Sequence, residues 1–273
     1  MIKINSELPN CMLDLNNELN DYDFILFHLY KNNNVYKEYY KQNKSNNRFT
    51  ILDNSAYEFY VKGEELDVES YVDTICELNP KLYILPDVLM DKEKTLNGVF
   101  KFLKEYKDKI ESKTDSKPLA VVQGNSEEEF MECLLQYRDN GISNIAIPFH
   151  NSFFLDIKPD EYILNDFGSE FGKINKDHKY AMGRIQWVIK NKYILNLFDH
   201  VHFLGSHCPL EKVYYKDYQS MDTGYPVKLG MVGEKLFRER EKPNIIIDEF
   251  IDEELTSQTK MLIIDNVLKF KCL

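Results

Sequence analysis

The sequence lacks the features that would mark a membrane, secreted or zinc protein. No apolar run approaches the roughly 18 residues that a membrane-spanning helix needs, and the opening segment MIKINSELPN holds no signal-peptide stretch. The five cysteines form no C-x-x-C or C-x-C pair, which argues against a disulfide framework or a structural zinc site. We therefore expect a soluble cytoplasmic protein with inert thiols, no metal ion, no cofactor and no membrane partner.

Basic residues are also scarce relative to acidic ones. The 273 residues include 34 Lys and Arg against 45 Asp and Glu, for a formal net charge of -11. This balance argues against sequence-blind wrapping of nucleic acid, which needs broad positive charge, but it leaves room for a local basic groove. Hydrophobic residues make up 43% of the chain, which is enough for a folded core.

Short apolar runs alternate with helical patterns from residue 24 to residue 230. Such runs, bounded by polar, Gly or Pro residues, are typical of strands buried on both faces. They cover 24–30, 49–56, 81–88, 118–124, 144–150, 201–206 and 218–222. The ranges 67–79 and 126–141 begin with helix start signals, Asp67 and Ser126. The range 179–200 is typical of one long helix or two. The alternation predicts βαβ units and a parallel sheet.

Seven strand candidates and one missed strand would close a (β/α)8 TIM barrel with inserted βα loops, and 273 residues suit one such domain over 1–273. A doubly wound open sheet is the alternative, which the absence of G-x-G-x-x-G and P-loop motifs disfavours. We expect 31–47 to be a solvated excursion or short surface helix without an apolar face. Residues 151–178 should be a long connection of the kind that serves as a lid or binding loop. Residues 245–273 should be largely helical and pack on the outside.

Polar residues follow six of the apolar runs, at the carboxyl ends where barrel enzymes place their active sites. They are Asp53-Asn54-Ser55, Pro86-Asp87, Gln123-Gly124, Pro148-Phe149-His150, Gly205-Ser206-His207 and Asp222-Thr223-Gly224. An Asp after a strand is often the N-cap of the next helix, but three such Asp residues and a Gln are harder to explain together by capping. A three-carboxylate metal site is disfavoured because no second acidic ligand recurs close by, and both histidines are expected to be loop or core residues.

Five local strings along this chain resemble the motifs of one known enzyme superfamily. LDNSAYE (52–58) resembles TDSGGFQ, AVVQGN (120–125) resembles VQGG, and HFLGSHCPLE (202–211) resembles YLMGVGTPED. YILPDVLMD (83–91) takes the place of the aspartate-bearing third strand, and SMDTGYPVK (220–228) parallels FDCVLPTR, with Pro four residues after Asp and a cation two further on. The order and approximate spacing of all five match over about residues 24–230, so the chain resembles the tRNA-guanine transglycosylase superfamily.

The chain departs from the tRNA enzymes in several places. It has no C-x-C-x-x-C plus His zinc site, it lacks the second arginine of the PTRNxR-type segment, and Ser55-Ala56 replaces the paired glycines. It is also about a hundred residues shorter than they usually are. These losses bear on tRNA recognition more than on the chemistry. They make the chain most like the compact zinc-free branch with which phages and some bacteria insert 7-deazaguanine bases into DNA. The Asn-, Lys-, Tyr- and Ile-rich composition suits an AT-rich phage genome, in which case the host cytoplasm is the location.

The resemblance implies a covalent base exchange. Asp222 would be the nucleophile that attacks the anomeric carbon and holds the sugar, as in retaining glycosidases. Asp53 would be the general acid/base for the leaving or entering base. Asp87 would accept hydrogen bonds from N1–H and the exocyclic amine of guanine, and Gln123 would donate to the base carbonyl. The other residues implied to line the base pocket are Gly124, Pro148, Phe149, Gly205 and Tyr57, of which Tyr57 or Phe149 would stack on the base.

The expected partners are DNA, ahead of tRNA, and a small 7-deazaguanine base such as preQ0. A duplex target would have to be flipped out or presented single-stranded. The cations expected to bind the phosphate backbone of the nucleic acid are Lys228, which aligns with a family arginine, and Lys235 and Arg238 of the run 235–244. Alternating acids make a solvated helix face an equal interpretation of that run.

Three alternatives remain open at the level of sequence. They are a tRNA-guanine transglycosylase, a non-catalytic subunit that only binds nucleic acid or a catalytic chain, and an unrelated barrel hydrolase with a carboxylate pair. Retention of Asp53 and Asp222 argues against the second, and the Gln123 and Pro226 matches argue against the third. The incoming base, the target sequence, a homodimer and a helper protein are not decided by the sequence.

Overall fold

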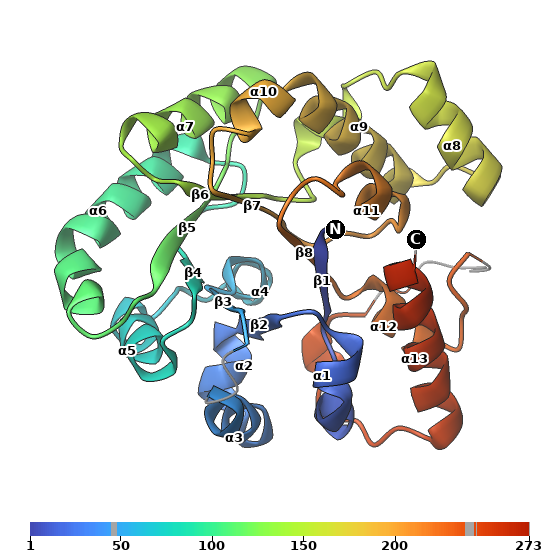
Figure 1. The fold of residues 1–273 in the computed structure, drawn as a ribbon, viewed down its shortest axis with the longest axis horizontal. Helices are drawn as coiled ribbons and strands as arrows, with labels where there is room; N and C mark the ends of the chain where they lie inside the picture. Colours follow the sequence, from blue (N-terminus) through green and yellow to red (C-terminus); the bar gives the residue numbers. More distant parts are fainter. Residues whose placement is uncertain (45–47, 238–242, 244, 273) are drawn as a thin grey trace. The chain divides into compact units, whose positions relative to one another are not determined.

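The computed structural model describes all residues except 45–47, 238–242, 244 and 273. Its eight described strands are all parallel and alternate with helices along the chain (Figure 1). They are β1 (Lys3–Ser6), β2 (Asp23–Leu26), β3 (Thr50–Asp53), β4 (Leu82–Ile84), β5 (Lys117–Val121), β6 (Asn144–Ile147), β7 (His200–Phe203) and β8 (Ser220–Thr223).

The strand order is β1-β8-β7-β6-β5-β4-β3-β2. Successive strands are neighbours from β2 to β8, and β1 pairs with β8, so the order never reverses as it does at the switch point of a doubly wound sheet. This is the alternation and order of a (β/α)8 TIM barrel, and the predicted fold class is confirmed. All seven predicted runs overlap a strand. The missed eighth is β1, which lies before the predicted repeat and pairs Asn5 with Asp222.

The described helices connect the strands and follow β8. They are η1 (Asn10–Leu15), α1 (Asn16–Leu19), α2 (Phe27–Asn32), α3 (Asn34–Asn43), α4 (Ala56–Lys62), α5 (Val68–Leu78), α6 (Lys92–Glu111), α7 (Glu127–Asp139), η3 (Ser152–Leu155), α8 (Glu161–Phe171), α9 (Lys176–Lys190), α10 (Lys192–Leu195), α11 (Leu210–Tyr214), α12 (Tyr225–Met231), η4 (Ile247–Glu249) and α13 (Ser257–Cys272). Among the described helices, none has both the length and the apolar character that crossing a membrane requires.

Internal contacts divide the chain into two compact units. The first unit comprises residues 1–21, 149–197 and 201–273, and the second comprises 22–148 and 198–200. The prediction of a single domain over 1–273 stays a prediction, and each unit is described by itself.

In the second unit the predicted helix signals act as expected. The Asp67 side chain caps α5 by accepting a hydrogen bond from the Ser70 amide, and Ser126 caps α7 by accepting one from the Glu129 amide. Tyr71 and Ile75 lie on the buried face of α5, at helical spacing. Capping and burial together fix where these helices begin and which face they turn inward.

The prediction that 31–47 has no apolar face is wrong. The segment forms the end of α2 and all of α3, and Tyr36 and Tyr40, one turn apart on α3, are 3% and 5% exposed. The Tyr36 hydroxyl accepts a hydrogen bond from the Leu26 amide at 3.1 Å. Tyrosine rings bury apolar area while the hydroxyl keeps a polar partner, so counting these residues as polar concealed the buried face.

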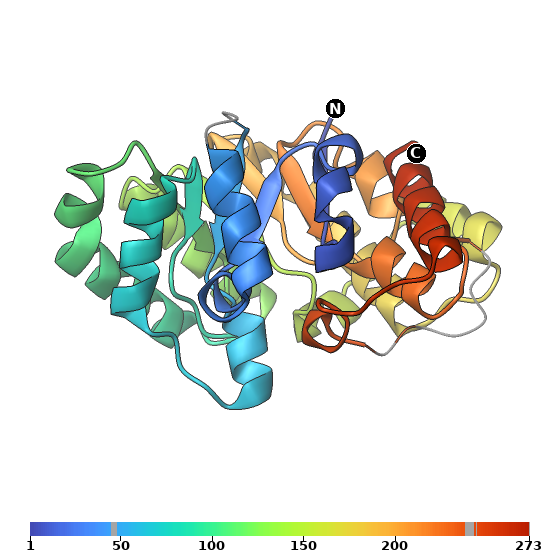
Figure 2. The ribbon, with the colours of Figure 1, turned by 90° about the horizontal axis from the view of Figure 1, so that it is seen from below.

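In the first unit, the long connection after β6 is built from η3 and α8, with Phe154 and Phe167 fully buried. The expected C-terminal helix is α13, which lies beside α12 in both ribbon views (Figures 1 and 2). Buried Asn266 of α13 joins them, because its side-chain amide donates to the Pro226 carbonyl at 3.2 Å. The end of the chain therefore supports the helix that follows β8.

Candidate active site

The predicted site residues divide between the two units. The first unit contains Asp222, Gly205, Phe149, Lys228 and Lys235, and the second contains Asp53, Asp87, Gln123, Gly124, Pro148 and Tyr57. Asp53 ends β3, Asp87 follows β4, and Asp222 is the last residue but one of β8.

Asp222, on β8 in the first unit, is held through one oxygen. Its Oδ1 accepts hydrogen bonds from the Gly205 amide at 3.0 Å and from His202 Nε2 at 3.1 Å. The Asp222 side chain makes no bond to the backbone of the following helix among the described residues, so helix capping does not explain it. The structure thus brings predicted residues Asp222 and Gly205 into contact and adds His202, which the sequence interpretation missed.

Gly205 reaches Asp222 because its backbone lies in the left-handed region, with φ of 63°. Glycine enters this region at little cost, whereas a side chain would add strain. Its neighbour Ser206 donates its hydroxyl to Glu211 Oε2 at 2.6 Å, and the Ser206 amide donates to the Asp222 carbonyl oxygen at 3.0 Å. The turn after β7 is therefore tied both to β8 and to α11.

A buried ion pair lies beneath this turn. Arg184 of α9 and Glu211 of α11 are both 0% exposed, and Arg184 Nε donates to Glu211 Oε1 at 2.8 Å. Arg184 Nη1 donates to the Leu204 carbonyl at 2.9 Å, and Ser206 occupies the other oxygen of Glu211. The pair thus contacts the residues on both sides of Gly205.

Phe149 lies in an aromatic cluster in the first unit. Its ring is stacked on His207, with centroids 4.7 Å apart and an interplanar angle of 9°, and the Arg184 guanidinium lies 4.8 Å from its centroid. Phe149 is 3% exposed, and His207 is in turn stacked on Tyr225 and bonded to Asp177 Oδ2 at 3.2 Å. The Phe149 ring already has stacking partners, so stacking on a base by this residue stays a prediction.

In the second unit, Asp87 is flanked by two side-chain amides. Asn54 Nδ2 donates to its Oδ1 and Gln123 Nε2 donates to its Oδ2, both at 2.8 Å. Gln123 is itself oriented because its Oε1 accepts from the Met90 amide at 2.9 Å. The structure therefore unites predicted residues Asp87 and Gln123 and adds Asn54, which the sequence interpretation placed next to Asp53 without a role.

Asp53 ends β3 and is 9% exposed. Its Oδ2 accepts a hydrogen bond from the Ser55 amide at 2.7 Å. Asp53 therefore stabilises the turn that follows β3, in addition to any role in catalysis. Ser55 lies in the left-handed region with φ of 60°, at a position where the resembling motif has glycine. Its hydroxyl accepts from the His28 amide at 3.1 Å, and a strained residue held in this way is typical of functional sites.

Gly124 has a packing role. A Cβ at this position would lie 2.7 Å from the Phe130 amide nitrogen and 2.9 Å from the Glu129 carbonyl carbon, both backbone atoms of α7. We expect Gly124→Ala to destabilise the protein by about 1–3 kcal/mol through this clash. Gly168→Ala in α8 is the matched control, because nothing lies within 4 Å of its Cβ and Ala favours the helix. Equal unfolding midpoints in urea for the two variants would contradict this account.

The remaining predicted residues are placed as follows. Tyr57 is 48% exposed and Pro148 is buried. Lys228 is half-buried, and its Cε would lie 3.0 Å from a Cβ at Gly224. Lys235 is exposed, and Arg238 lies outside the described residues. Their predicted roles stay predictions.

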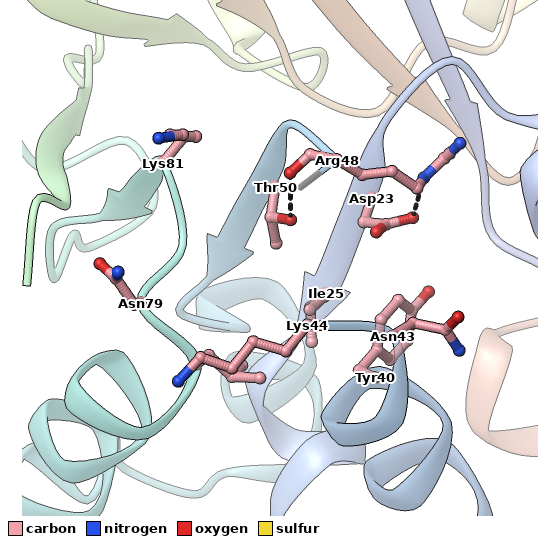
Figure 3. Close-up of a pocket in the computed structure, with 10 residues that line it drawn as sticks. Asp23, Ile25, Tyr40, Asn43, Lys44, Arg48, Thr50, Asn79 and Lys81 are labelled. Atoms are coloured by element: carbon pink, nitrogen blue, oxygen red, sulfur yellow. Dashed lines mark hydrogen bonds and ion pairs between the residues drawn. The ribbon is translucent and has the colours of Figure 1, made fainter. Parts of the chain in front are cut away.

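A pocket in the second unit lies at the amino ends of β2, β3 and β4 (Figure 3). Its lining residues are Asp23, Ile25, Tyr40, Asn43, Lys44, Arg48, Thr50, Leu78, Asn79 and Lys81. Arg48 turns toward Asp23, with Nε 3.1 Å from Oδ1, while Lys44 donates to the Glu77 carbonyl. The cations do not converge on one point, and predicted residues Asp53, Asp87 and Gln123 of this unit lie instead at or just after the carboxyl ends of β3, β4 and β5.

No cluster of three or more His, Cys, Asp or Glu side chains suited to a metal ion occurs in the described part of the chain. Comparison of the sequence with protein-family models and with curated proteins finds no match in either set.

Proposed function

We propose that this protein is a base-exchange transglycosylase that replaces guanine in DNA with a 7-deazaguanine base. The observation that carries the proposal is the group formed by Asp87, Asn54 and Gln123 in the second unit. Guanine presents two N–H donors, at N1 and the exocyclic amine, beside a carbonyl acceptor. A carboxylate next to an amide N–H is the complement of that edge.

The capacity of these side chains fits a bound base. An ionised carboxylate has about four lone-pair sites, and the two amides occupy one on each oxygen of Asp87, which leaves acceptors for the two donors of guanine. Gln123 has a second N–H on Nε2 for the base carbonyl. Adenine has an acceptor at N1, an amine in place of the carbonyl and no amine at C2, so the group favours guanine. An unrelated sugar hydrolase has no need of such a group.

The proposed chemistry has two displacements at the same sugar carbon. An oxygen of Asp222 bonds to C1′ as the bond from C1′ to guanine N9 breaks, and Asp53 delivers the proton that the departing base takes up. Asp53 then removes a proton from the incoming base, whose nitrogen bonds to C1′ as the ester to Asp222 breaks. Two inversions retain the configuration at C1′, and the exchange needs no redox cofactor.

Because the protein is acidic overall, DNA must bind through local cations, for which we propose Lys228, Lys235 and Arg238. A small number of phosphate contacts implies weak affinity, which falls with salt in proportion to the number of contacts. The direct test is to incubate the protein with labelled 7-deazaguanine and either guanine-containing DNA or tRNA, and to follow label into polymer. Label in DNA supports the proposal, label in tRNA alone selects the tRNA enzyme, and no label in either leaves the non-catalytic subunit.

The pH dependence of base binding provides a further prediction. Burial raises the pKa of Asp87 above its ordinary value of 3.8, while hydrogen bonds from Asn54 and Gln123 oppose the shift. Because the contacts to guanine need the ionised form, we expect KM for the base to rise as pH falls through this raised pKa. Steady-state exchange rates between pH 4 and pH 8 measure it, and a base KM independent of pH over that range would contradict the role of Asp87.

Protonation of Asp87 should affect the stability of the fold in the opposite sense to base binding. A carboxyl whose folded-state pKa is raised favours the folded state when it is protonated. Its contribution to stability is therefore fully present below the unfolded pKa and is lost as pH rises through the folded value. Acid should weaken base binding through Asp87 without unfolding the protein through the same residue.

A further inference from the structure

We infer that His202 is a positioning residue that selects which oxygen of Asp222 reacts. The inference rests on the proposed function and adds to it a residue that the motif comparison did not assign. It is carried by three side chains of the first unit, His202, Ser220 and Asp222, which are 0%, 0% and 3% exposed.

The sheet places these three side chains on one face. His202 of β7 pairs in register with Ser220 of β8. Ser220 and Asp222 are two residues apart on β8, and side chains at that spacing point to the same side of a strand. The alternate positions are taken by apolar residues that are buried, namely Val201, Phe203 and Met221. The period of two therefore produces a polar row of Ser220, His202 and Asp222.

The hydrogen bonds along this row define the proton on the imidazole. His202 Nε2 lies 3.1 Å from Asp222 Oδ1, and His202 Nδ1 lies 2.8 Å from the Ser220 hydroxyl oxygen. An ionised carboxylate only accepts, so Nε2 carries a proton. In the neutral ring Nδ1 then accepts a hydrogen bond from the Ser220 hydroxyl. This contact selects the tautomer whose Nε2 proton is donated to Asp222.

The row leaves the two oxygens of Asp222 unequal. Oδ1 accepts from both His202 Nε2 and the Gly205 amide, whereas Oδ2 has no hydrogen-bond donor in the described part of the chain. The electron pairs of Oδ2 are therefore the ones available to attack C1′. The donors on Oδ1 also fix the rotation of the carboxylate, so Oδ2 is aimed before substrate binds.

The same donors assist the second displacement. Once Oδ2 is bonded to C1′, Oδ1 becomes the carbonyl oxygen of the ester and still accepts from His202 and Gly205. When the incoming base bonds to C1′, the electron pair of the C1′–Oδ2 bond returns to the carboxylate. Hydrogen bonds already in place at Oδ1 stabilise that negative charge without reorganisation. His202 should therefore speed both steps without touching the base.

The test compares His202→Phe, which keeps the ring and removes the N–H donor, with His202→Gln, whose amide can donate from a similar position. Removal of one preorganised donor typically lowers kcat by roughly 10²–10³-fold. We expect that loss in His202→Phe with the base KM unchanged, and partial recovery in His202→Gln. A purely structural role would lower the amount of folded enzyme, leave its kcat unaltered and show no recovery by Gln.

Ser220→Ala gives a second measurement if His202→Phe does not fold. It leaves the imidazole in place and removes the partner that selects its tautomer, so kcat should fall about tenfold, within the range of a lost supporting contact. Nitrogen NMR of the wild-type imidazole should show Nε2 protonated. If the wild type exchanges bases and all folded variants keep full kcat, the inference is overturned while the proposed function stands. If the wild type exchanges no base into any guanine-containing nucleic acid, both are overturned.

Discussion

Asp222→Asn is expected to abolish base exchange, with a loss of roughly 10⁴-fold or more. An amide cannot form the ester that holds the sugar. Its carbonyl oxygen can still accept the hydrogen bonds that Gly205 and His202 give to Oδ1, so the fold should be retained. Single-turnover incorporation of labelled base into DNA measures the loss.

Asp217→Asn is the matched control for this substitution. Asp217 lies three residues before β8 and forms an exposed ion pair with Lys192 at 2.8 Å. Exposed pairs of this kind contribute about 0–1 kcal/mol, so the control should keep full activity. Undiminished exchange by Asp222→Asn would refute the assignment of Asp222 as the nucleophile.

The second large effect is expected at the ion pair under the turn after β7. Glu211→Gln keeps the shape of the side chain but removes the negative charge that pairs with the fully buried Arg184 guanidinium. Breaking one side of a buried pair costs about 3–5 kcal/mol, and we expect Glu211→Gln to lower the free energy of unfolding by that amount. Urea unfolding measures it, with Asp217→Asn again as the exposed control.

The same substitution should also affect the site. Glu211 anchors Ser206, and Arg184 anchors Leu204, on the two sides of the Gly205 amide that bonds Asp222. The folded fraction of Glu211→Gln should therefore exchange bases more slowly than wild type. A loss of stability below about 1 kcal/mol would show that the pair is no stronger than a surface pair.

The barrel fold was predictable because its strands are short apolar runs between helical patterns. That signal is a consequence of burial on both faces, and it located seven strands. It missed β1, whose four residues KINS contain a single large apolar side chain. It also failed at α3, where buried Tyr36 and Tyr40 were counted as polar.

The candidate site was predictable where polar residues end an apolar run and was missed where they lie inside one. Asp87 and Gln123 follow β4 and β5, and Asp222 ends the run 218–222 although it lies on β8. His202 and Ser220 lie inside their runs and carry no such signal. Another signal was present, because His202 and Ser220 take alternate positions with the apolar Phe203 and Met221. Contacts such as that between Asn54 and Asp87 join residues 33 apart in the chain, and no local pattern encodes them.

The sequence indicates that Arg184 is part of a buried ion pair, but it does not identify the partner. It lies in the segment AMGRIQWV of α9, on the face that buries Ile185 and Trp187. A charged residue on an apolar helix face is rarely buried without a partner. The sequence therefore signals a buried ion pair, but the identity of Glu211 as the partner depends on the tertiary fold.

Exchange through an ester on Asp222 can be demonstrated by mass spectrometry of the trapped intermediate. The protein is mixed with a guanine-containing single-stranded DNA oligonucleotide in the absence of an incoming base, denatured and digested. We expect release of free guanine and a peptide containing Asp222 that carries the oligonucleotide without its guanine. Guanine release with the adduct on any other residue, or exchange with no adduct at all, would contradict exchange through Asp222.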